Sequence, residues 1–155
     1  MPIFHIKNEI MQLLPIQQNL EDNSAFFHLH DDVTYLSMTI GFFEKVGYNP
    51  PWISYFAQKE GELVGTCAFK GQPMGGKVEI AYGTFEPFQR QGIGTEMCRQ
   101  LVLLAQQTDP TVRITARTLP EPNYSTRILE KNNFRLLGIV DDPEDGEVWE
   151  WEYFG

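Results

Sequence analysis

The chain has 155 residues, of which 42% are hydrophobic and 13% aromatic, which excludes a disordered tail and predicts one domain, residues 1–155, with its own core. The formal net charge of −9 argues against nucleic-acid binding through a broad basic face, and an acidic surface would instead attract cationic amines or basic peptides. No apolar run approaches the length of a membrane span and no signal-peptide pattern opens the chain, so we expect a soluble, cytoplasmic protein without a membrane anchor. Cys67 and Cys98 lie in apolar runs, which predicts reduced core cysteines.

The first third of the chain predicts an edge strand followed by two helices. Residues 11–16 form a short apolar run that contains a proline, as edge strands often do. Residues 17–23 are polar and predict a turn. Residues 24–46 carry a helical pattern that breaks around Asp31 and Asp32, either of which can be the N-cap of the second helix.

A hairpin and a central strand come next. Residues 52–58 and 63–70 are strand-like and flank Glu60-Gly61, which predicts a tight turn. Residues 78–85 alternate with a period of two, so one face of this strand is apolar and the other is mixed. The apolar face comprises Val78, Ile80 and Tyr82, and the opposite face comprises Glu79, Ala81 and Gly83.

The second half predicts a helix over 95–107, a strand over 112–118, a short helix capped by Asn123, and an antiparallel hairpin of 134–140 with 147–154. The strand over 112–118 follows the central strand through a helix, so the two strands should be parallel. The whole order of elements predicts an α/β fold, with a mixed sheet of about six to seven strands flanked by about four helices.

The junction between the central strand and the next helix reads Gln89-x-x-Gly92-x-Gly94 and leads into Thr95. A glycine-bearing loop at a helix N-terminus presents unpaired N–H groups and the positive end of the helix dipole, which suits a phosphate group. A P-loop is excluded because no Gly-Lys-Ser/Thr occurs, and the dinucleotide fingerprint is excluded because Met97 stands where its third glycine belongs. A glycine-rich turn without a ligand is the alternative interpretation.

This loop resembles the Q/R-x-x-G-x-G/A acyl-CoA loop of the GNAT superfamily of N-acetyltransferases. Residues 78–84 resemble the "VEIGYG" strand of the branch that includes the ribosomal-protein N-terminal acetyltransferases. Residues 118–134 resemble the T-x-x-x-N-x-x-S-x-R-x-L-E-K-x-G-F block of the same branch, with Asn133 in place of the glycine. The order of elements is also similar to that fold. The resemblance therefore implies a single-domain, GNAT-like mixed sheet.

The resemblance implies transfer of an acetyl group from the co-substrate acetyl-CoA to a primary amine of a small molecule or peptide. The pantetheine arm would lie beside the central strand near Thr84 and Phe85, where a local bulge would open the strand. Asn123 matches the family asparagine that contacts the pantetheine, and its other role is helix capping. The diphosphate would be held by the loop residues Gln89, Arg90, Gln91, Gly92, Ile93, Gly94 and Thr95.

Glu79 is the candidate general base. A primary amine is protonated at neutral pH and cannot attack until a carboxylate takes its proton, directly or through water. A glutamate in the middle of a sheet needs a reason, and the alternative is an ion pair with Lys70 or Lys77.

The acid that protonates the leaving thiolate has no clear candidate in the pattern. Leu129 stands where many family members carry a tyrosine for this role, although this branch commonly lacks it. Ser125 is our candidate hydrogen-bond donor to the leaving sulfur, with Tyr124 as its rival. Because a coenzyme thiol has a pKa near that of cysteine, about 8.5, the need for an acid is modest.

Two further patterns favour structural roles. His28 and His30 diverge on a helix, so we do not expect a metal site there. Six aromatic residues near the predicted helix pair could line an acceptor pocket, but most are expected in the core. They are Phe26, Phe27, Tyr35, Phe42, Phe43 and Tyr48.

Two other functions are also compatible with the sequence. Without the expected tyrosine, the chain could be a non-catalytic acyl-CoA-binding or sensor domain, and a structural domain with an empty loop is a third reading. The acceptor, the acyl chain length and the oligomeric state, a homodimer among the choices, are not encoded in the pattern. The predicted function is that of an N-acetyltransferase.

Overall fold

The computed structural model describes residues 10–27 and 33–155, which form a single seven-stranded sheet with three α-helices and two short 3-10 helices. The strands are β1 (Gln12–Pro15), β2 (Ser54–Lys59), β3 (Glu62–Phe69), β4 (Lys77–Thr84), β5 (Arg113–Thr118), β6 (Phe134–Asp142) and β7 (Gly146–Tyr153). The helices are η1 (Leu20–Phe26), α1 (Val33–Val46), η2 (Glu86–Phe88), α2 (Ile93–Thr108) and α3 (Tyr124–Lys131). None of the helices in these ranges is long and apolar enough to cross a membrane.

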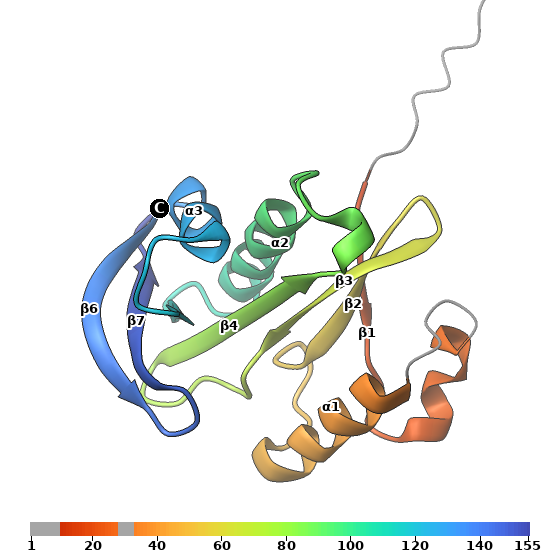
Figure 1. Cartoon of the computed structure of the whole chain (residues 1–155). Helices are drawn as coiled ribbons and strands as arrows, with labels where there is room; N and C mark the ends of the chain where they lie inside the picture. Colours follow the sequence, from red (N-terminus) through yellow and green to blue (C-terminus); the bar gives the residue numbers. More distant parts are fainter. Residues whose placement is uncertain (1–9, 28–32) are drawn as a thin grey trace, which may run out of the picture.

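The strand order is β1-β2-β3-β4-β5-β7-β6, so β1 is an edge strand as predicted (Figure 1). β4 and β5 are parallel, which confirms the prediction, and their connection runs through α2. Helices α2 and α3 lie on one side of the sheet, and α1 lies on the other (Figure 1). The predicted mixed α/β fold is therefore confirmed.

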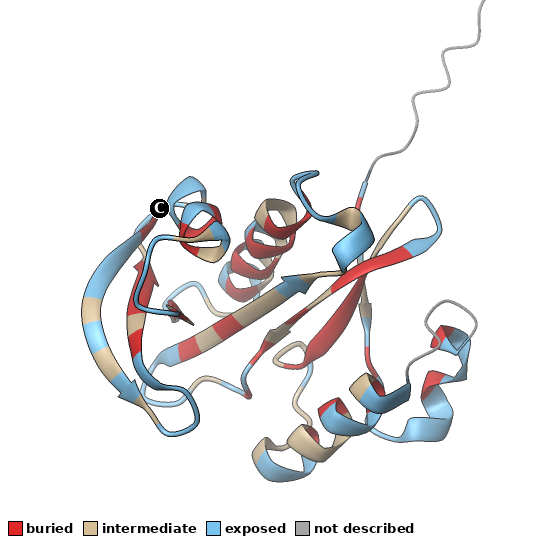
Figure 2. Ribbon diagram, viewed as in Figure 1, coloured by how far each residue is buried: buried red, intermediate tan, exposed pale blue. Residues whose placement is uncertain are grey.

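The core lies mainly between the sheet and α2. Val78 and Ile80 of β4 are buried there, and the buried side of α2 faces the strands (Figure 2). Most apolar residues of this helix lie on one stripe, since positions three and four apart share a face of a helix, whereas Leu103 is exposed. The fully buried members of the stripe are Met97, Cys98, Leu101 and Ala105. Both cysteines are buried free thiols, as predicted.

β4 opens at its C-terminal end by parting from β5. Its pairing with β5 stops at Ile80↔Ala116, although β4 continues to Thr84 and β5 continues to Thr118, where its other edge still pairs with β7. The register between β3 and β4 runs without a shift, so the expected bulge in the central strand is wrong. Divergence of two neighbouring strands, and not an extra residue in one of them, exposes the end of β4 to a ligand.

The segment after β1 differs from the sequence prediction. The predicted turn at 17–23 overlaps the 3-10 helix η1, which begins at Leu20, four residues before the predicted helix. The reason is Asn23, whose fully buried side chain accepts from the Gln17 N–H at 2.7 Å and donates to the carbonyls of Gln17 and Asn19. An asparagine that satisfies backbone groups stabilises such a turn in place of a helical ladder. The predicted caps Asp31 and Asp32 lie outside the described residues.

Candidate functional site

The loop before α2 presents backbone N–H groups. Helix α2 begins at Ile93, two residues earlier than predicted, because Gly92 precedes it in the left-handed conformation with φ of +78°. Arg90 also has a positive φ, +66°, which is uncommon for a residue other than glycine. The N–H groups of the first turn of a helix have no partner within the helix, and no side chain caps the N-terminus of α2. This end of the helix therefore favours an anion.

The two glycines of the motif have different roles. A Cβ on Gly92 would meet no atom within 4 Å, so this position is glycine for its backbone conformation. A Cβ on Gly94 would lie 2.5 Å from Cδ1 of Ile128 on α3, so Gly94 lets the two helices approach each other. The second glycine thus makes room for the protein itself, which sequence reasoning alone did not distinguish from room for a ligand.

A cavity of about 640 Å³ lies between the loop and α3. On α3, residues at spacings of three and four share one face, and that face forms the second wall of the cavity. Four of the predicted coenzyme residues line it, whereas Ile93 is buried in the core. The lining comprises Gln89, Arg90, Gly92 and Thr95 from the loop and α2, and Tyr124, Arg127, Ile128 and Lys131 from α3.

The cavity is cationic in a protein of net charge −9. Arg90, Arg127 and Lys131 line it and are exposed, and no carboxylate is among its lining residues. Within residues 10–27 and 33–155, none of these three cations makes an ion pair. Three uncompensated positive charges beside a helix N-terminus create a local field that suits a polyanion.

The open end of β4 lies next to this loop. Gln89 Nε2 donates to the Thr84 carbonyl at 3.4 Å, which joins the loop to the strand. Thr84 Oγ1 is buried and has no hydrogen-bond partner in the described part of the chain. The Phe85 N–H is already bonded to the Val64 carbonyl at 2.9 Å. A buried hydroxyl without a partner is uncommon and marks a place where a ligand group can bind.

Helix α3 is held against the opening by Tyr82, whose hydroxyl donates to the Ser125 carbonyl at 3.2 Å. Burial raises the pKa of Tyr82, so it remains a neutral donor.

Asn123 caps α3 through a capping box: its side chain accepts from the Thr126 N–H at 3.0 Å. Leu129 is completely buried, so the position of the missing tyrosine lies in the core of this protein.

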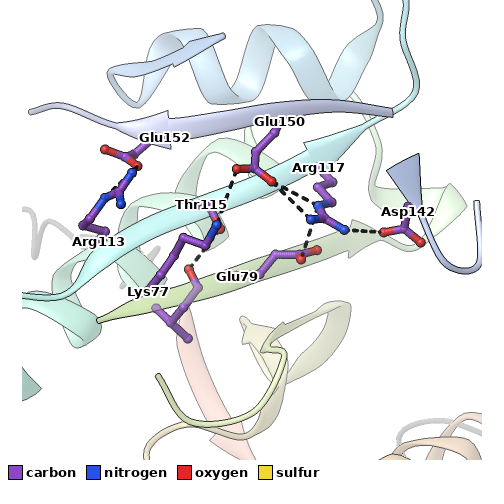
Figure 3. A network of polar contacts seen from close by, with 9 residues as sticks. Lys77, Glu79, Arg113, Thr115, Arg117, Asp142, Glu150 and Glu152 are labelled. Atoms are coloured by element: carbon purple, nitrogen blue, oxygen red, sulfur yellow. Dashed lines mark hydrogen bonds and ion pairs between the residues drawn. The ribbon is translucent and has the colours of Figure 1, made fainter. Parts of the chain in front are cut away.

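Glu79 lies on the other face of β4, away from α2, within a network of charges (Figure 3). Its carboxylate is 3.0 Å from Lys70 Nζ and 3.8 Å from Arg117 Nε. Lys77, the other suggested partner, pairs with Glu150 at 3.6 Å. Glu79 and Ser125 are therefore not brought together: Glu79 lies on the face of the sheet that carries α1, and Ser125 lies on the side of α3.

A second cavity, of about 530 Å³, lies on the same face of the sheet as Glu79, beneath α1. Ser54, Ala68 and Ala81 stand opposite one another on β2, β3 and β4, and these small side chains form its floor. We call this cavity the α1 groove. Its other lining residues are Tyr35, Met38, Thr39, Phe42 and Val46 from α1, Lys70, and Asp142, Pro143 and Glu144 from the β6–β7 turn. Sequence reasoning missed the floor because only strand register aligns its three residues.

The aromatic residues divide between core and groove. Tyr35 and Phe42 line the α1 groove, whereas Phe26 and Phe43 are buried. The prediction that most belong to the core and some to a pocket is thus partly confirmed. His28 and His30, considered as metal ligands, lie outside the described residues.

Comparison with known proteins agrees with this architecture. A model of the GNAT acetyltransferase domain matches residues 3–135. No curated protein matches the sequence significantly. Several solved structures share the fold at low sequence identity, which is evidence for the fold alone.

One is the ribosomal L7/L12 α-N-protein acetyltransferase RimL in complex with coenzyme A, at 17% identity and a TM-score of 0.68, covering 96% of each chain. Another is the microcin C7 self-immunity acetyltransferase MccE with acetyl-CoA and AMP, at 14% identity and a TM-score of 0.69, covering 96% of this chain and 94% of that one. A third is a GNAT-family acetyltransferase from Bacillus anthracis, at 18% identity and a TM-score of 0.67, covering 93% and 94%. From the match to the family model over most of its length, the chain belongs to the GNAT acetyltransferase family, whose co-substrate is acetyl-CoA.

Proposed function

We propose that this protein is an acetyl-CoA-dependent N-acetyltransferase that acetylates a primary amine. The observation that carries this proposal is the cationic cavity at the N-terminus of α2, which adjoins the open end of β4. A helix N-terminus with uncapped N–H groups binds phosphate, and an unpaired strand end can bind the amides of a pantetheine arm. Two neighbours by fold, RimL and MccE, were solved with coenzyme A and acetyl-CoA respectively.

The proposed coenzyme contacts come from the loop before α2, from the end of β4 and from the start of α3. The loop from Gln89 to Thr95 would bind the diphosphate, with Arg90 as a side-chain partner. The backbone near Thr84 and the Thr84 hydroxyl would bind the pantetheine, and Asn123 would contribute beside its capping role. Acetyl-CoA supplies the acetyl group and leaves as the thiol.

The amine acceptor would enter through the α1 groove, on the opposite face of β4 from α2. The roof of the groove is mostly apolar, and its floor of small residues leaves room for a compact group. This favours an amine attached to a compact apolar or aromatic group, whose ammonium the carboxylates of Asp142 and Glu144 in the lining would attract. The coenzyme and the acceptor would then meet across the open end of β4.

Proton transfer is assigned to residues on either side of this opening. Glu79 would take a proton from the ammonium group through intervening water, because the carboxylate lies five residues before Thr84, about 16 Å along an extended strand. The neutral amine nitrogen then forms the new bond to the acetyl carbon as the bond to sulfur breaks, and the second proton that the nitrogen loses converts the thiolate to the thiol. Ser125 or Tyr124 would donate a hydrogen bond to the leaving sulfur.

A non-catalytic acyl-CoA sensor is the second candidate, favoured by one observation: the position of the family tyrosine holds the buried Leu129. Two measurements on the wild-type protein separate the candidates. Isothermal titration with coenzyme A tests binding, and a thiol-release assay with acetyl-CoA and a panel of primary amines tests transfer. Release with at least one amine supports the enzyme, binding without release for any amine supports the sensor, and no binding contradicts both.

A further inference from the structure

Helix α3 carries two cations toward the coenzyme cavity that the diphosphate does not require. Arg127 and Lys131 are four residues apart, so they lie on one face of the helix and about 6 Å apart along its axis. Both side chains line the cavity opposite the loop. Neither makes an ion pair within the described ranges, and the acids of this strongly acidic protein are absent from the lining.

The charges on the loop side already suffice for a diphosphate. The uncapped first turn of α2 offers N–H groups and the helix dipole, and Arg90 adds one positive charge on the same wall. Arg127 and Lys131 on the other wall are exposed and one helical turn apart, so an anion that enters the cavity can bind between two positive charges. The opposite wall therefore points to a second phosphate, separate from the first.

We propose that Arg127 and Lys131 bind the ribose 3′-phosphate of the coenzyme, so that the protein discriminates coenzyme A from dephospho-coenzyme A. This inference rests on the proposed function, since it requires that the coenzyme occupy the cavity. A 3′-phosphate carries close to two negative charges at neutral pH and three acceptor oxygens. Arginine can bind such a group through two parallel N–H bonds, and lysine adds a point charge.

A structural role for the same residues is the competing explanation. Lys131 lies in the last turn of α3, where a cation also stabilises the helix dipole. Lys45 provides the matched control, because it is an exposed lysine in the last turn of α1 and does not line the coenzyme cavity. Replacement of Lys45 by glutamine removes the same charge from an equivalent helical position.

The test is isothermal titration of the whole protein with coenzyme A and with dephospho-coenzyme A, for the wild type, Arg127→Gln, Lys131→Gln and Lys45→Gln. We expect the wild type to bind coenzyme A roughly tenfold or more tightly than dephospho-coenzyme A, as one charge-assisted contact provides. Each α3 variant should lose most of this preference while its affinity for dephospho-coenzyme A stays unchanged. Lys45→Gln should keep the wild-type ratio.

The titrations distinguish a failure of this inference from a failure of the proposed function. Equal affinity of the wild type for the two ligands would overturn the inference and leave the proposed function standing. An equal loss of both affinities in the α3 variants would also overturn it, because that result indicates a structural role. If the wild type bound neither ligand, the inference would fall together with the proposed function.

Discussion

Arg117 on β5 donates from Nη1 to Oδ2 of Asp142 at 2.9 Å, and this ion pair ties the tip of the β6–β7 hairpin to the sheet (Figure 3). The other oxygen of Asp142 accepts from the backbone N–H groups of Glu144 at 2.9 Å and Asp145 at 3.1 Å. Pro143 and Glu144 line the α1 groove, so one aspartate both shapes the turn and positions a wall of the proposed acceptor site.

The first prediction concerns the pH dependence of this tether. Hydrogen bonds from the Glu144 backbone, from Arg117 and from the Asp145 backbone lower the pKa of Asp142 from 3.8 to about 2. Because the folded-state pKa is lowered, the stabilisation is fully present above about pH 4 and is lost as the pH falls through about 2. We therefore expect Asp142→Asn to lower the urea midpoint near neutral pH, by an amount that shrinks as the pH approaches 2.

Asp145→Asn is the charge-matched control for that series. Its carboxylate makes no ion pair or hydrogen bond among the described residues, so its replacement should not lower the urea midpoint near neutral pH as Asp142→Asn does. Equal pH profiles for the two variants would contradict the role assigned to Asp142.

The second prediction is a double-mutant cycle between the helices of the proposed coenzyme cavity. Gly94→Ala places a Cβ 2.5 Å from Ile128 Cδ1, and overpacking of this kind destabilises a protein by about 1–3 kcal/mol, partly offset by the better helix propensity of alanine. Ile128→Val removes that same Cδ1 atom. In the Ile128→Val background, Gly94→Ala should therefore be neutral or stabilising. Urea unfolding of the four proteins gives the coupling free energy, and additive effects would disprove the contact.

The third prediction tests the floor of the α1 groove. Ala81→Leu should fill the space above β4 and raise the KM for the amine acceptor roughly tenfold or more, because a pocket discriminates at the level of single methylene groups. The affinity for coenzyme A should not change, since its cavity lies on the other face of the sheet. Ala25→Leu, on the exposed side of η1, is the control and should leave both values unchanged. Unaltered acceptor kinetics in Ala81→Leu would remove the groove from the proposal.

The fourth prediction concerns Glu79. Glu79→Gln preserves the shape of the side chain but cannot take a proton, so kcat should fall by about 10²–10⁴ with little change in acetyl-CoA affinity. Glu150→Gln is the control: it removes another acid of the same network, one that also pairs with Arg117 and Lys77, without touching the proposed base. Both variants should lose stability to a comparable extent. If turnover over the accessible pH range were the same in the two, Glu79 would be only a structural partner of Lys70.

The sequence by itself determined most of the local structure and the order of the elements. Alternation marked β4, and the parallel direction of β5 followed from the helix between them. Asn123 was recognisable as a cap and Asn133 as a left-handed residue, with φ of +65°, because these features depend on a few neighbouring residues. The loop before α2 could be located for the same reason: its glycines, its polar residues and the following helical stripe are contiguous in the chain.

Only the tertiary structure decided which distant residues share a surface. The row Ser54, Ala68 and Ala81 exists because of strand register, and the contact of Gly94 with Ile128 exists because two helices pack closely. Likewise, the opening of β4 depends on the point at which β4 and β5 stop pairing, and no local pattern encodes that divergence. The physical reason is that periodicity fixes the face on which a side chain lies, whereas the partner of that face is fixed by packing between segments far apart in the chain.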